Sequence, residues 1–78
     1  MKVKITKPDS NLYEGEAQLL QLPGTGGIFE IMRHHAPIVS ALKKGTLRMV
    51  VNEADTRTFE IRGGVVQCQN DEVLILVQ

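Results

Sequence analysis

The side chains in this sequence that are best suited to metal binding or catalysis are two adjacent histidines and one cysteine. His34 and His35 are common metal ligands, but neighbours on a strand point to opposite faces, and no further ligand is suitably spaced. Cys68 is in phase with Val66 in an apolar strand pattern, which indicates a buried structural thiol rather than a nucleophile. We therefore expect no metal site, no catalytic residue and no bound cofactor.

A glycine-rich segment offers two further patterns, because residues 22–27 read LPGTGG. The first five letters match the sorting motif of sortase-anchored proteins, which functions near the end of an exported chain, before an apolar segment and a basic tail. The glycines also suggest a phosphate loop, but that loop needs Gly-Lys-Ser/Thr at the start of a helix. Here Ile28, Phe29 and Glu30 follow in a strand-like pattern, so we interpret the segment as a turn.

The segments around these residues have the pattern of short strands. Apolar and polar residues alternate with period two in segments 2–6, 46–51 and 58–62, and turn residues recur at short intervals. Residues 37–44 fit either a strand or one helical turn, whereas residues 73–77 are apolar on both faces and predict a central strand. Without a long crossover helix the strands must be mostly antiparallel. We expect an all-β fold, an antiparallel β-sandwich of about ten short strands in two sheets.

The length of the chain and its balance of charges limit the classes of function that it can have. Seventy-eight residues form a single domain, 1–78, with a thin core that a bound partner would stabilise. Nine basic and nine acidic side chains balance, which argues against nucleic acid or anionic lipid as a partner. The apolar run 73–77 is too short to span a bilayer, and no signal peptide is evident at the start. We expect a cytoplasmic protein without direct membrane insertion.

Several segments, taken in order, resemble the epsilon subunit of rotary F-type ATP synthases. Residues 22–37 are similar to the family pattern LPGxxGxFGILPGHAP, and residues 42–48 to ALKPGxLR. Residues 59–66 resemble FxVxGGFV, residues 73–76 resemble the VTVL ending, and residues 13–16 resemble FxGE. The resemblance therefore covers essentially the whole chain.

The resemblance implies a ten-stranded sandwich that serves as a central-stalk rotor subunit. Such a subunit binds the foot of the gamma subunit and rests on the polar loops of the membrane c-ring, coupling proton-driven rotation to ATP synthesis. It is a non-catalytic monomer within the complex, held peripherally at the cytoplasmic face of the bacterial plasma membrane. A generic β-sandwich adaptor of another complex is the main alternative, followed by an oligonucleotide-binding module and an unrecognised enzyme.

The same resemblance assigns two interaction surfaces and a set of structural glycines. The loop expected to face the c-ring comprises Thr25, Gly26, Gly27, Ile28 and Glu30. The edge expected to face the gamma subunit comprises His35, Pro37, Ser40 and Lys43. The glycines expected to be structural are Gly24, Gly63 and Gly64. Gly63 and Gly64 interrupt a strand pattern, which predicts a bulge or a close backbone approach there. For His35 the alternative is that residues 35–37 merely shape a turn, with proline fixing φ.

The sequence departs from the family pattern in one segment. Glu30, Arg33 and His34 stand where the family usually has Gly, Pro and Gly, so the turn before His35 is expected to differ. Many members have an acid at the position of Ile28; because residues i and i+2 of a strand share a face, we expect Glu30 to contact a basic c-ring loop instead.

The family pattern also includes a segment beyond the sandwich. Most members continue into a two-helix hairpin that inhibits hydrolysis and in some members binds ATP. This sequence stops at Gln78. We therefore expect the C-terminal two-helix hairpin to be absent, with no ATP binding and no inhibition by a tail.

Overall fold

The computed structural model describes residues 1–78 and contains nine β-strands and no helix. The strands are β1 (Lys2–Lys7), β2 (Ser10–Glu16), β3 (Leu19–Gly24), β4 (Gly27–Met32), β5 (Ile38–Leu42), β6 (Gly45–Asn52), β7 (Asp55–Ile61), β8 (Gly64–Gln69) and β9 (Glu72–Val77). None of its elements is a helix of the length and apolarity that crossing a membrane requires. The expected all-β class is confirmed.

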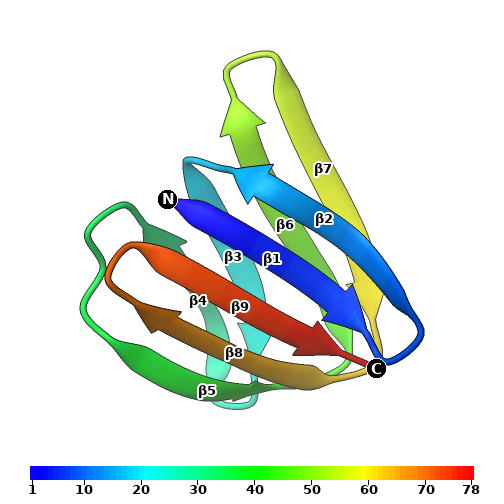
Figure 1. Cartoon of the computed structure of the whole chain (residues 1–78). Helices are drawn as coiled ribbons and strands as arrows, with labels where there is room; N and C mark the ends of the chain where they lie inside the picture. The colour runs from blue at the N-terminus through cyan, green and yellow to red at the C-terminus, as the bar shows by residue number, and fades with distance from the viewer.

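The strands belong to one hydrogen-bonded sheet rather than two. Their order is β2-β1-β9-β8-β5-β3-β6-β7, and β4 pairs with β3 outside this path. The sheet curls on itself, so that β1, β9 and β8 lie over β3, β4 and β6 (Figure 1). The expected two sheets of about ten strands are corrected to one sheet of nine, because the pairing of Leu42 with Gly24 joins β5 to β3. Two backbone hydrogen bonds reinforce this junction, Lys43 N to Pro23 O at 2.8 Å and Thr25 N to Ala41 O at 3.2 Å.

Seven of the eight strand pairings are antiparallel, and the pairing of β1 with β9 is parallel. The segment that fitted either a strand or a helical turn is strand β5, which pairs with β8 from Ile38↔Cys68 to Leu42↔Gly64. Strand β9 is central, as predicted, because it lies between β1 and β8. The first and last strands of the chain therefore lie side by side in the middle of one half of the sheet.

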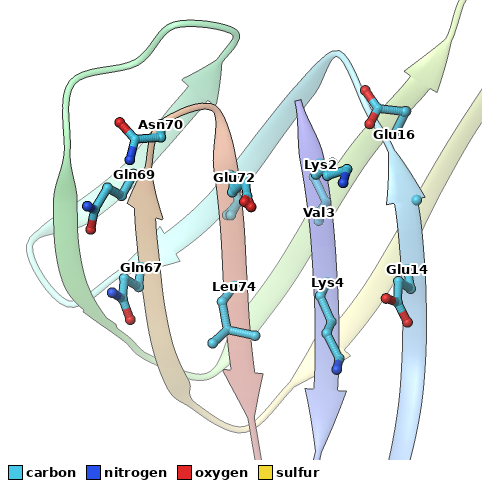
Figure 2. A pocket seen from close by; sticks show the side chains of 12 residues that line it. Lys2, Val3, Lys4, Glu14, Glu16, Gln67, Gln69, Asn70, Glu72 and Leu74 are labelled. Carbon is cyan, nitrogen blue, oxygen red and sulfur yellow. The ribbon is translucent and has the colours of Figure 1, made fainter.

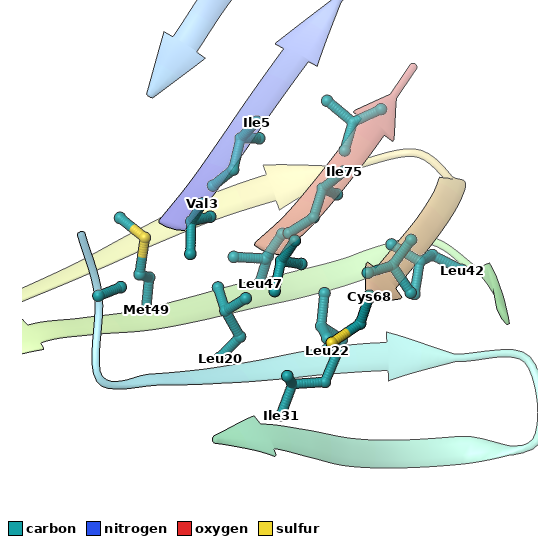
Figure 3. Close-up of a cluster of buried hydrophobic side chains, with 14 of the residues drawn as sticks. Val3, Ile5, Leu20, Leu22, Ile31, Leu42, Leu47, Met49, Cys68 and Ile75 are labelled. Atoms are coloured by element: carbon teal, nitrogen blue, oxygen red, sulfur yellow. The ribbon is translucent and has the colours of Figure 1, made fainter. Parts of the chain in front are cut away.

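The core lies between the two halves of the curled sheet. Period-two alternation sends every second side chain inward, including Val3 and Ile5 of β1, Leu20 and Leu22 of β3, and Ile75 of β9 (Figure 3). These side chains are at most 2% exposed, and burying each contributes about 1.5–3 kcal/mol. The fully buried core is thus apolar, with no buried polar or charged residue.

Strands β2 and β7, at the two ends of the sheet, contact one another through side chains. The guanidinium of Arg57 lies 5.1 Å from the centre of the Tyr13 ring. Asp55 holds Arg57 in place with an ion pair of 3.1 Å, and the Tyr13 hydroxyl donates to Glu16 O at 2.7 Å. Asp55 raises the pKa of Arg57, first through the hydrogen bond that it accepts from the Arg57 guanidinium and then through its negative charge. The contact closes the open side of the curled sheet.

Candidate interaction surfaces

The glycine-rich segment forms the tip of the β3–β4 hairpin. Gly24 pairs with Gly27, which leaves Thr25 and Gly26 as an exposed two-residue loop. Gly27 has φ 132°, a conformation that glycine adopts readily because it has no Cβ. The interpretation of this segment as a turn is confirmed.

The outer face of β4 combines apolar side chains with one acid. Ile28 and Met32 are 72% and 55% exposed, and Glu30 projects from the same face between them. Gln21 Nε2 of β3 donates to Glu30 Oε2 at 3.3 Å, but none of the three ion pairs of the chain includes Glu30. The shared face predicted for Ile28 and Glu30 is confirmed, and the carboxylate remains free to meet an external cation.

The turn that joins β4 to β5 contains both histidines. His34 has φ 64°, in the left-handed region, and its N–H donates to Asp71 Oδ1 at 2.9 Å. The next residue, His35, is half-buried; its N–H donates to Met32 O at 3.2 Å, and its Nδ1 lies 2.6 Å from Ala36 O. Because a carbonyl only accepts, Nδ1 is the donor in this contact. His35 is therefore held at the start of the segment that leads into β5.

The residues expected to face the gamma subunit lie before, within and after strand β5, and they differ in exposure. Pro37 precedes the strand and Lys43 follows it, and both side chains are exposed. Ser40 pairs with the buried Val66, shares its inward face and is half-buried. The outward positions of β5 are instead Val39, which is 72% exposed, and Ala41.

These outward positions belong to an apolar surface that sequence reasoning missed, which we call the β5–β8–β9 face. Its members lie in two rows set by the strand pairing: Ala41, Val65 and Leu76 in one, and Val39, Gln67 and Leu74 in the other. Val65, Leu74 and Leu76 are 43%, 36% and 49% exposed. The only feature of the sequence that could have indicated this exposed apolar face was the unbroken apolar run of β9. Such a run is equally typical of a strand that is buried on both faces.

Next to this face the outer surface becomes charged. Figure 2 shows an open groove over β2, β1, β9 and β8, lined among others by Lys2, Lys4, Glu14, Glu16 and Glu72. Strand pairing sets Lys2 between Glu16 and Glu72, and Lys4 opposite Glu14. Opposite charges alternate across the groove, so it has no dominant sign with which to attract one class of charged ligand.

The three glycines expected to be structural differ in how crowded their positions are. A Cβ on Gly64 would lie 2.2 Å from Leu76 O, and one on Gly24 would lie 2.8 Å from Gly27 O and from the Phe29 ring. At Gly63 the nearest atom would be Leu42 O at 3.4 Å, which is ordinary contact. The predicted close backbone approach is thus found at Gly64.

Neither the cysteine nor the histidines form a reactive cluster. Cys68 is buried, and its burial, followed by the charge of Asp71, raises the pKa of the thiol. A raised pKa keeps the sulfur in its unreactive protonated form at neutral pH. No group of three or more metal-ligating side chains gathers in the chain.

Comparison with known proteins gives consistent results. The model of the β-sandwich domain of the ATP synthase delta/epsilon chain matches residues 1–78. An ATP synthase epsilon chain of Chlorobium limicola is 31% identical over 77 residues, covering 99% of this chain and 88% of that relative.

Two solved structures share the fold. A chain of the Euglena gracilis mitochondrial ATP synthase superposes with a TM-score of 0.90 at 18% identity, covering 96% of this chain and 48% of that one. A chain of the Tetrahymena thermophila enzyme, from a structure of its central stalk and c-ring, gives a TM-score of 0.84 at 15% identity, covering 99% and 62%. The chain thus spans about half to two thirds of the length of these structural relatives.

Proposed function

Because the chain belongs to the β-sandwich family of ATP synthase delta and epsilon chains, we propose that it is a rotor subunit that binds the gamma subunit and the c-ring. In this role it couples proton-driven rotation to ATP synthesis and performs no chemical step itself. It acts as a monomer within the complex, peripheral to the cytoplasmic face of a bacterial plasma membrane. The Tetrahymena relative, from a structure of a central stalk and c-ring, supports this assignment.

The observation that carries the proposal is a pair of exposed apolar surfaces on opposite sides of the curled sheet. The β5–β8–β9 face looks outward from one half, and the outer face of β4 looks outward from the other (Figure 1). Exposed apolar side chains that cluster on a small domain mark sites of protein contact. A subunit between two partners needs two such surfaces.

We assign the β5–β8–β9 face and its rim to the gamma subunit. The rim includes three residues expected from the sequence, with His35 and Pro37 before strand β5 and Lys43 after it. The strand itself contributes Val39 and Ala41, whereas Ser40 lies on the inner side of the rim. An apolar centre with a polar rim is the usual anatomy of a specific interface.

We assign the β3–β4 hairpin and the outer face of β4 to the c-ring. The hairpin tip at Thr25, Gly26 and Gly27 is exposed and free of bulky side chains. Beside it, Ile28 supplies apolar area and the unpaired Glu30 supplies a negative charge. This combination suits a polar loop that carries a basic residue.

Two matched substitutions test both assignments. Val39 and Ile28 are each 72% exposed, lie on opposite outer faces and are β-branched, so threonine replaces either with little effect on the fold. We expect Val39→Thr to weaken binding of purified gamma subunit about tenfold, because burying an unpaired hydroxyl costs about 1–3 kcal/mol. We expect Ile28→Thr to leave gamma binding unchanged and to weaken association with c-rings. The measurements are isothermal titration with gamma and co-sedimentation with c-rings in detergent.

Each variant serves as the control for the other. Failure of the unaltered chain to bind gamma at any salt concentration would refute the rotor assignment as a whole. Equal loss of gamma affinity in both variants would show that the two surfaces are assigned wrongly, even though the partner is correct.

A further inference from the structure

Two turns that are far apart in sequence meet at one end of the sheet. The β4–β5 turn contains His34, and the β8–β9 turn consists of Asn70 and Asp71, between the paired residues Gln69 and Glu72. Figure 1 shows the two turns next to each other at the same end of the molecule. The hydrogen bond from His34 N to Asp71 Oδ1, 2.9 Å long, joins them directly.

His34 needs this support because of its backbone conformation. At φ 64° it lies in the left-handed region, which is disfavoured for residues with a Cβ. A conformation of this kind persists only where the surrounding structure stabilises it. The carboxylate of Asp71 provides that stabilisation, since hydrogen bonds to a charged acceptor are the stronger kind.

Asp71 is a costly residue for its own turn. Asn70 and Asp71 have φ of 53° and 60°, as a two-residue hairpin turn with two left-handed positions requires. Glycine is the favoured residue at the second position, so the aspartate adds strain to the β8–β9 hairpin. Its side chain is therefore best explained by what the carboxylate contacts outside the hairpin.

We propose that Asp71 is a positioning residue for the gamma-facing rim: its carboxylate holds the turn at His34 and so fixes where His35 and the start of β5 lie. The proposal rests on the proposed function for its partner, but its structural part can be tested without a partner. His35 directly follows His34, and the N–H of His35 closes the turn by donating to Met32 O. We call the hydrogen bond from His34 N to Asp71 Oδ1 the Asp71 clasp. Loss of this clasp frees the turn and displaces the rim.

The charges around Asp71 agree with this role. The ammonium group of Met1 lies 3.8 Å from Asp71 Oδ2, and the Arg33 guanidinium and the His34 ring also act electrostatically on this carboxylate. The hydrogen bond from His34 N lowers the pKa of Asp71, and the nearby positive charges lower it further against an opposing effect of burial. The carboxylate is consequently ionised, and able to accept the hydrogen bond, throughout the neutral range.

The test is a double-mutant cycle that combines Asp71→Gly with His34→Gly in the full chain. Asp71→Gly removes the carboxylate but gives the β8–β9 turn its preferred residue, so the fold survives. His34→Gly makes the left-handed position favourable without the clasp. Asp71→Asn, which keeps an acceptor oxygen and tolerates the left-handed conformation, is the conservative control.

Nuclear magnetic resonance reads the positioning directly. In the unaltered chain we expect the His34 amide proton to resonate downfield and to titrate with the Asp71 carboxylate at acid pH. Asp71→Gly should abolish this signature and shift the amide signals of His35 and Val39, whereas the same change in the His34→Gly background should leave those two signals in place. Equal shifts in both backgrounds, or none in either, would overturn the proposal.

Binding to the gamma subunit provides the second readout. We expect Asp71→Gly to weaken gamma binding about tenfold with His34 present, and clearly less in the His34→Gly background, while Asp71→Asn loses only part of the affinity. If the unaltered chain does not bind gamma, the proposed function fails and the resonance data alone decide on the clasp. If the chain binds gamma but the loss is the same in both backgrounds, the clasp does not position the rim.

Discussion

Glu30 is a single exposed charge that has no ion-pair partner within the chain. Its carboxylate projects between Ile28 and Met32, accepts one hydrogen bond from Gln21 and makes no ion pair. An external cation can therefore pair with it without displacing an existing partner. Exposed ion pairs contribute about 0.2–1 kcal/mol, so in the proposed c-ring contact we expect Glu30 to add selectivity and speed to binding more than affinity.

We predict that Glu30→Gln weakens c-ring association by up to about fivefold at low salt, which corresponds to about 1 kcal/mol. The difference should shrink at high salt, because mobile ions screen exposed charges. Co-sedimentation with c-rings across a salt series measures it, with Glu53→Gln in the exposed β6–β7 turn as the matched control. Unchanged association at low salt would remove Glu30 from the interface.

Gly64 and Gly26 give opposite expectations for the same substitution. Alanine at position 64 would place its Cβ 2.2 Å from the backbone oxygen of Leu76 in the neighbouring strand, whereas alanine at position 26 would meet nothing within 4 Å. We predict that Gly64→Ala lowers the free energy of unfolding by at least about 2 kcal/mol, because β8 and β9 must move apart. Gly26→Ala should change it by less than about 0.5 kcal/mol.

Urea unfolding followed by circular dichroism compares the two variants. A Gly64→Ala protein as stable as the Gly26→Ala protein would mean that β8 and β9 separate there at little cost. The contrast also distinguishes the two glycine-rich segments, one required for packing and the other for an exposed loop.

Among the strands, the inner face was largely predictable from the sequence and the outer face was not. Alternation identified the inward positions of β1, β6 and β7, because burial on one face of a strand leaves a period-two pattern. The same pattern cannot tell an apolar residue covered by a second layer from one that awaits a partner. For that reason the apolar run of β9 predicted its central place in the sheet but not that Leu74 and Leu76 on its outer face are partly exposed.

The number of sheets and the Asp71 clasp could not be predicted from the sequence, for a related reason. Both depend on contacts between distant segments, Gly24 with Leu42 in one case and His34 with Asp71 in the other. Local propensity does not encode such pairings, and residues 33–34 lie where the sequence leaves the family pattern. Segment 37–44 became a strand because β8 supplies five paired positions, which outweighs a short helical pattern.

Strand β9 pairs with a neighbour on each side, so its loss should affect the whole fold. Without it, β1 would keep only β2, β8 would keep only β5, and Ile75 would leave the core. We predict that a chain ending at residue 71 is unfolded, with no cooperative thermal transition. Circular dichroism and amide dispersion check this, and a chain ending at residue 77 is the control. A cooperative transition in the shorter chain would show that β1 and β8 can pair directly.

At the scale of the whole molecule, acid should unfold the domain through its ionised carboxylates. The pKa of Asp71 is lowered in the folded state, so its contribution to stability is fully present above the unfolded-state value of about 3.9 and is lost as the pH falls through the folded value. We predict that stability falls below about pH 4 and that Asp71→Asn reduces this dependence. Urea midpoints between about pH 2.5 and 7 measure it; an unchanged slope in the variant would contradict the assignment.

The parallel pairing of β1 with β9 also has a consequence for how the protein is made. Residues 2–6 leave the ribosome well before their partners at residues 72–76. Until then β1 has one unpaired edge, and the apolar side chains of Val3 and Ile5 lack part of the surface that finally covers them. Folding of this domain is thus complete only after β9 has been synthesised, and before that the nascent chain presents a strand edge that holding chaperones can shield.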